Sequence, residues 1–160
     1  MDFSSPGQMV LKLWQQTQKL PLGKRCFAWS MKWFVPYSGA LGAVVEELEP
    51  GRCVVRLDER RAVRNHLRSV HALALANLGE LVSGLAILTQ LSNQVQGIVV
   101  RIDTHYHKKA RGRLLAECQH QLAPVKAQRE EQIEAIIRDS AGETVATVKV
   151  TWTLRNKAHR

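Results

Sequence analysis

The feature that most constrains the fold is a run of mainly small and apolar residues over positions 69–91, which contains no proline. Ala, Leu, Val and Ile dominate this run and predict a helix that begins near Ser69, with the Ser69 side chain as its N-cap. A helix this apolar must be buried on most of its sides. It nevertheless carries Glu80, and a carboxylate is costly to bury unless it is paired or used.

The spacing of His71 and Glu80 adds a second constraint. The two residues are nine positions apart, which is about 13.5 Å along a helix and places them on opposite faces. They are therefore not expected to meet within one helix. If both belong to one site, the simplest arrangement is a two-fold dimer in which the helix of one chain faces that of the other. A capped helix start followed by a surface glutamate is the alternative that the spacing leaves open.

Length and composition set the class of protein. A chain of 160 residues is expected to form one domain with a substantial core. No apolar run reaches the ~18–20 residues that a membrane span needs, and the N-terminus, with Asp2, does not resemble a secretory signal. Cys26, Cys53 and Cys118 are widely spaced, which favours reduced thiols in a cytoplasmic protein and gives no support for a metal site. No cofactor is expected.

The formal net charge of +9 permits nucleic acid, an anionic membrane, or small anionic ligands and acidic carrier proteins as partners. A solvated basic surface is the default interpretation. Nucleic-acid binding is not favoured, because the basic residues occur in short groups without interleaved aromatic residues. The groups are Arg60, Arg61, Arg64 and Arg68; Lys108, Lys109, Arg111 and Arg113; and Arg155, Lys157 and Arg160.

The N-terminal region has its own pattern. Residues 7–20 predict a short helix that Pro21 and Gly23 end. Residues 24–34 are rich in large apolar side chains and end before Pro36; a second helix and an irregular apolar arm both fit. Within this arm, residues 1–36, the aromatic residues 27–34 either cover an edge or face of the sheet or cap a ligand cavity and set the chain length that fits.

The rest of the chain, residues 37–160, predicts a sheet around the long helix. Residues 43–49 and 53–58 flank a Glu-Pro-Gly turn and precede the helix. Four runs with period-two alternation follow it, and the last two flank a turn at residues 139–143. The runs cover residues 98–103, 114–119, 133–137 and 145–154. An antiparallel sheet that curls around one buried helix gives an α+β domain.

This order of elements, with Asn65 six residues before His71 and Glu80 nine residues after it, resembles the hot-dog-fold thioesterases of the phenylacetate-pathway type. The chain looks closest to a poorly characterised bacterial branch of that superfamily. The resemblance covers roughly residues 39–155 and includes the strand-turn-strand pattern of residues 105–114. It implies a hot-dog fold, a homodimer or dimer of dimers, and hydrolysis of acyl-CoA or acyl carrier protein thioesters at sites between protomers.

The resemblance also implies roles. Glu80 would activate water or attack the carbonyl, and partial burial would raise its pKa toward neutral pH. The backbone N–H of Ala72, at a helix N-terminus, would stabilise the oxyanion. Asn65 and His71 would orient the carbonyl, the water or the loop. Asn77 would line the acyl pocket or form a hydrogen bond at the dimer seam.

Four basic residues are candidate ligands for the phosphates of coenzyme A, namely Arg64, Lys108, Lys109 and Arg111. The chain also departs from the family pattern, because Ala72-Leu73 replaces the common Gly-Gly, Arg68 stands where a glycine is frequent, and Glu80 replaces the commoner Asp. These departures keep two alternatives open: a non-catalytic protein that binds acyl thioesters, and a hot-dog dehydratase or hydratase.

Overall fold

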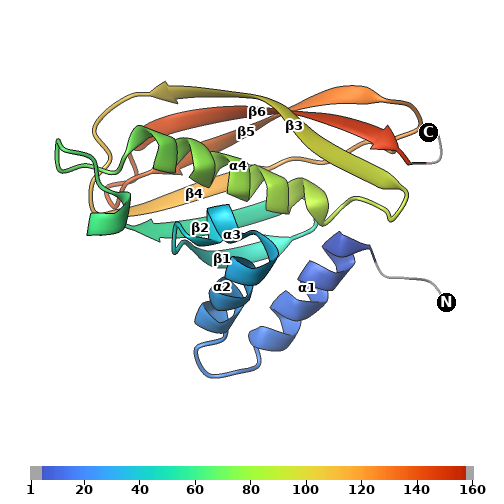
Figure 1. Ribbon diagram of the computed structural model, residues 1–160, viewed down its shortest axis with the longest axis horizontal. Helices are drawn as coiled ribbons and strands as arrows, with labels where there is room; N and C mark the ends of the chain where they lie inside the picture. Colours follow the sequence, from blue (N-terminus) through green and yellow to red (C-terminus); the bar gives the residue numbers. More distant parts are fainter. Residues whose placement is uncertain (1–4, 158–160) are drawn as a thin grey trace.

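The computed structural model describes residues 5–157. A six-stranded antiparallel sheet in the order β1-β2-β4-β5-β6-β3 curls around one long helix, α4 (Ala72–Leu88) (Figure 1). The strands are β1 (Val44–Glu49), β2 (Arg52–Asp58), β3 (Val95–Tyr106), β4 (Arg113–Gln119), β5 (Arg129–Arg138) and β6 (Thr144–Asn156). The predicted α+β hot-dog architecture is confirmed.

The alternation of side chains explains why these segments form one sheet. In β4, Leu114 and Ala116 are buried while their neighbours are exposed. They pair with the buried Leu57 and Val55 of β2, so that both strands present one apolar face to α4. The predicted turn at residues 139–143 is also confirmed, and Asp139 closes it by accepting hydrogen bonds from two backbone N–H groups.

Helix α4 begins later than predicted, because its N-cap is His71 and not Ser69. The His71 Nδ1 accepts a hydrogen bond from the Leu73 N–H at 3.1 Å. Ser69 is instead held in the preceding loop, where its N–H and its hydroxyl both donate to Asn65 Oδ1. At the helix middle, Gly79 allows α4 to approach β6, since a Cβ there would lie 2.4 Å from the Cβ of Val148.

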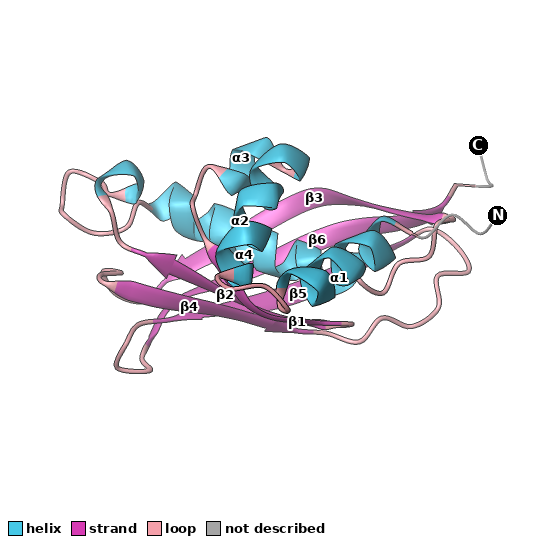
Figure 2. Ribbon diagram, turned by 90° about the horizontal axis from the view of Figure 1, so that it is seen from below, coloured by secondary structure: helices cyan, strands magenta, loops and turns pink. Residues whose placement is uncertain are grey.

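The N-terminal region forms three helices, α1 (Pro6–Thr17), α2 (Gly23–Phe34) and the short α3 (Pro36–Gly39). Residues 24–34 thus form a helix and not an irregular segment. Trp14 of α1 contacts Phe27 of α2 edge to face, with ring centroids 5.1 Å apart. Figure 2 shows α4 lying in the curved sheet with these helices beside it. We call residues 5–40 the helical arm.

The helical arm lies next to β1, whereas β3 forms the far edge of the sheet (Figure 1). Gly7 brings α1 against the end of α4, since a Cβ there would lie 1.9 Å from the Leu88 carbonyl oxygen. Within residues 5–157, no helix is long and apolar enough to cross a membrane.

Candidate active site

Glu80 lies in the middle of α4 and is half-buried. Burial raises the pKa of its carboxyl group above the usual range, and a hydrogen bond with the Ser38 side chain opposes this shift only in part. The Ser38 hydroxyl also donates to Asn77 Oδ1 at 2.8 Å. Because a hydroxyl has one hydrogen, Ser38 donates at any one time either to Asn77 Oδ1 or to the Glu80 carboxylate.

Ser38 is the site residue that the sequence did not indicate. It belongs to α3 and reaches Asn77 across 39 positions of sequence. No local pattern identifies such a contact, because only the packing of the helical arm against α4 creates it. The predicted pair of Asn77 and Glu80 lies one helical turn apart, and Ser38 links the two side chains.

A cavity of about 780 Å³ lies beside Glu80, between the helical arm and the C-terminal half of α4. Its walls are mostly apolar, and this volume lies in the range of about 300–1,000 Å³ that is typical of ligand pockets. α1, α2, α4, the start of β3 and Trp152 of β6 all contribute to the lining. Gly84 keeps the wall open, since a Cβ there would lie 3.2 Å from the Trp152 ring and 3.9 Å from Glu80 Oε1.

The loop before α4 is organised by Asn65. Its side-chain oxygen accepts hydrogen bonds from the N–H groups of Leu67 and Ser69 and from the Ser69 hydroxyl, at 2.9–3.2 Å. The loop also contains Arg68 in a left-handed conformation, with φ of 54°. Within one chain, Asn65 therefore has a positioning role, because it fixes the backbone that leads to His71.

The first turn of α4 presents two hydrogen-bond donors. His71 is exposed and uses Nδ1 to cap the helix, so that in its neutral form Nε2 carries the proton and faces outward. The Ala72 N–H has no acceptor in the part of the chain that the structure describes. The Tyr106 hydroxyl donates to the Ala72 carbonyl oxygen at 3.0 Å and ties this turn to the end of β3.

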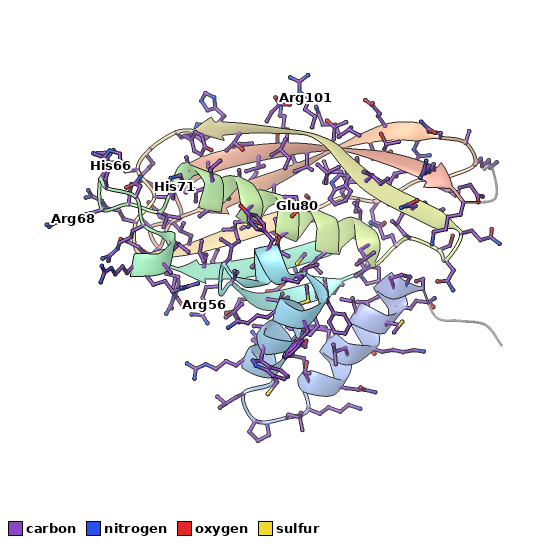
Figure 3. All side chains as sticks on the ribbon, viewed as in Figure 1. Arg56, His66, Arg68, His71, Glu80 and Arg101 are labelled. Atoms are coloured by element: carbon purple, nitrogen blue, oxygen red, sulfur yellow. The ribbon has the colours of Figure 1, made fainter. Side chains whose placement is uncertain are left out.

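One chain does not bring the predicted catalytic residues together. His71 lies at the N-terminal end of α4 and Glu80 near its middle, as Figure 3 shows. They share no hydrogen-bond partner among residues 5–157. This agrees with the spacing argument from the sequence, by which a shared site requires a second chain.

Two of the predicted phosphate ligands already have acidic partners. Lys108 is bonded to Asp139 and Glu143, and Arg64 Nε lies 2.5 Å from Glu59 Oε1. A phosphate group would have to compete with these carboxylates.

The other two predicted phosphate ligands lie in the loop after β3. Lys109 and Arg111 are exposed in the loop between β3 and β4. Neither forms an ion pair within 4.0 Å among residues 5–157, although Arg111 lies close enough to Glu59 to help lower the pKa of that carboxyl group. They are the better placed of the four candidates.

Solved structures share this architecture. A structural-genomics protein, APC5556, has a TM-score of 0.80 and 23% identity, over 92% of this chain and 99% of its own. PA5026 from Pseudomonas aeruginosa, called a protein of unknown function and probable thioesterase, has a TM-score of 0.71 and 27% identity, over 86% and 97%. The thioesterase SAV0944 from Staphylococcus aureus, as a mutant, has a TM-score of 0.66 and 14% identity, over 76% and 99%.

These likenesses and the strand order place the chain in the hot-dog thioesterase superfamily, which confirms the resemblance seen in the sequence. Residues 23–154 match the family described as a domain of unknown function, DUF4442. The chain belongs to this family. No curated protein matches its sequence.

Proposed function

We propose that this protein hydrolyses acyl thioesters at a site shared between two protomers. The observation that carries the proposal is a half-buried carboxylate, Glu80, with a raised pKa beside an apolar cavity. A carboxylate in such a place is costly for stability and is typical of a catalytic base. The cavity offers room for an acyl chain whose carbonyl carbon lies near Glu80.

The chemistry follows from the groups on α4. Ionised Glu80 takes a proton from water as the water oxygen attacks the thioester carbonyl carbon. The oxyanion of the tetrahedral intermediate accepts a hydrogen bond from the Ala72 N–H, with the partial positive charge of the helix N-terminus behind it. When the intermediate collapses, the C–S bond breaks and protonated Glu80 returns its proton to the leaving thiolate. Direct attack by Glu80 would require the same ionised carboxylate and remains the alternative route.

The free edge of β3 supports the second protomer. β3 is a 12-residue edge strand with apolar side chains exposed along it, including Val100 at 51%. A long apolar edge is normally covered or blocked. Pairing of two β3 edges about a two-fold axis would cover both strands. It would also bring Asn65, His71 and Ala72 of the partner subunit toward Glu80.

The basic residues in the loop that leads into β4 support a thioester substrate whose thiol component carries phosphate groups. Lys109 and Arg111, both exposed, would bind phosphate groups such as those of coenzyme A or of the phosphopantetheine of an acyl carrier protein. The helical arm closes the cavity and would set the acyl length that fits. Met31 of α2 and Leu13 of α1 contribute to the wall that the arm provides.

Release of free thiol from short, long and aromatic acyl-CoAs tests the proposal. Wild type is expected to turn over at least one class, and Glu80→Gln is expected to lose that turnover. Glu130→Gln, a substitution of an exposed glutamate on β5, is the matched control and should retain it. Tight binding without turnover would instead support the non-catalytic alternative.

A further inference from the structure

The outward face of α2 carries an unusual set of exposed aromatic side chains. Trp29 and Trp33 are 62% and 74% exposed and contact each other with ring centroids 6.1 Å apart. Phe34 is 65% exposed and Tyr37 of α3 is 79% exposed. Side chains of this kind normally lie inside a protein, and a group of them on its surface marks an interaction site. We call these four residues the aromatic patch.

The charged side chains of the helical arm itself have one sign. Residues 6–40 contain no Asp or Glu, and their basic residues are Lys12, Lys19, Lys24, Arg25 and Lys32. Arg25 is four positions before Trp29, and Lys32 is three positions after it, so both lie on the tryptophan face of α2. Both are exposed, whereas Lys24 forms an ion pair with Glu46 of β1.

Aromatic residues flanked by lysine and arginine on a short amphipathic helix are the combination that binds the interface of an anionic bilayer. A second copy of the same arm would bring like charges together, which opposes self-association through this face. The arm packs beside β1, at the opposite edge of the sheet from β3 (Figure 1), so that pairing of two β3 edges does not use the face of α2 that carries Trp29 and Trp33.

We infer that the helical arm docks on an anionic lipid surface, with Trp29 and Trp33 in the headgroup region and Arg25 and Lys32 against the lipid phosphates. The turn between α1 and α2 adds two more exposed apolar side chains to the arm, since Leu20 and Leu22 are 55% and 68% exposed. Docking of this kind is peripheral, and it does not depend on the proposed hydrolysis.

The aromatic patch is continuous with the cavity. Phe34 belongs to the patch and also lines the cavity, together with Val35, the next residue along the chain, and the exposed Met9 of α1. Docking would therefore bring the wall of the cavity to the bilayer surface. An acyl chain could then pass between the membrane and the cavity without crossing water.

Vesicle flotation tests the inference directly. The full chain is expected to float with vesicles of phosphatidylcholine and phosphatidylglycerol (3:1) and not with phosphatidylcholine alone. Lys32→Glu changes the local charge by two, and at about fivefold for each charge it should weaken binding about 30-fold. Lys126→Glu makes the same change in an exposed loop outside the arm and should have little effect. Trp29→Ala combined with Trp33→Ala should weaken binding at least about tenfold.

A fluorescent label on Cys26 gives an independent readout. Cys26 is exposed on α2, three positions before Trp29, whereas Cys53 and Cys118 are buried. An environment-sensitive dye at Cys26 should shift its emission to the blue when anionic vesicles are added.

Three results would overturn the inference. They are no flotation of the wild type, equal loss of flotation with Lys126→Glu, and a tryptophan double variant that lowers the oligomeric mass instead of vesicle binding. The last result would assign the aromatic patch to a protein interface.

Discussion

Gly79 is the position at which the packing of the site can be tested most sharply. It belongs to the turn of α4 that carries Glu80, and an added Cβ would lie 2.4–2.6 Å from three side-chain carbons of Val148. The optimal separation is about 3.5–4.0 Å, so that Gly79→Ala requires a shift of more than about 1 Å. Val148 is fully buried in β6, so a shift of its side chain would disturb the core around it.

Two opposing terms decide the result of Gly79→Ala. Alanine favours the helix by about 1 kcal/mol relative to glycine, whereas overpacking a core costs typically about 1–3 kcal/mol and occasionally more. Because the clash involves several atoms of a β-branched residue, we expect overpacking to win with a net loss of about 1–2 kcal/mol. The melting temperature should fall by about 2–4 °C for each kcal/mol.

Urea unfolding at a fixed protein concentration measures this loss, and a double-mutant cycle identifies its cause. Val148→Ala alone opens a cavity and is destabilising. In the double variant the two changes should compensate, with a coupling energy of about 0.5–3 kcal/mol. If Gly79→Ala is as stable as wild type, or if the two substitutions are additive, the close approach of α4 and β6 is not what requires glycine here.

Three further predictions follow from the same structure. In Gly84→Ala the added Cβ would lie 3.2 Å from the tip of the Trp152 ring and in ordinary contact with Glu80 Oε1 at 3.9 Å; the variant should fold normally but lower kcat/KM selectively for the longest acyl chains accepted. Burial raises the Glu80 pKa, so ionisation destabilises the folded state as pH rises from about 4.3, the value in unfolded chains, through the folded value. Glu80→Gln should accordingly raise the melting temperature at pH 8 and change it little at pH 3.5, which thermal unfolding at both pH values would check. Burial, with a smaller effect of Glu117, raises the pKa of the Cys118 thiol to about 12, so mass spectrometry after iodoacetamide treatment should find Cys26 alkylated and Cys118 intact until the protein unfolds.

The sheet was predictable because its information is local. Alternation in residues 114–119 and 145–154 assigns an inner and an outer face to each strand. The structure has these faces in β4, whereas in β6 Val145 and Thr151 of the expected outer face are buried as well. The start of α4 was not predictable in the same way, because Ser69 and His71 are both able to cap the helix. Asn65 binds Ser69 from four positions away and leaves His71 as the N-cap.

The arm contained a helix-start signal that hydrophobic periodicity does not use. Ser5 and Gln8 form a capping box, and their side chains bond each other's backbone N–H groups at the start of α1. The contacts of the candidate site were beyond sequence reasoning, since Ser38 meets Asn77, and Lys108 meets Asp139, only after distant segments pack. The spacing alone did indicate that His71 and Glu80 do not meet within one helix.

Mixed dimers of two inactive variants test the central claim most directly. Glu80→Gln and His71→Ala are each expected to abolish thioester hydrolysis as homodimers. If each site takes Glu80 from one protomer and His71 from the other, a mixed dimer has one intact site. Random mixing should then restore about one quarter of wild-type activity, because half of the dimers are mixed and one of their two sites works. Activity that stays absent in verified mixed dimers, while the wild type is active, would contradict a site shared between protomers.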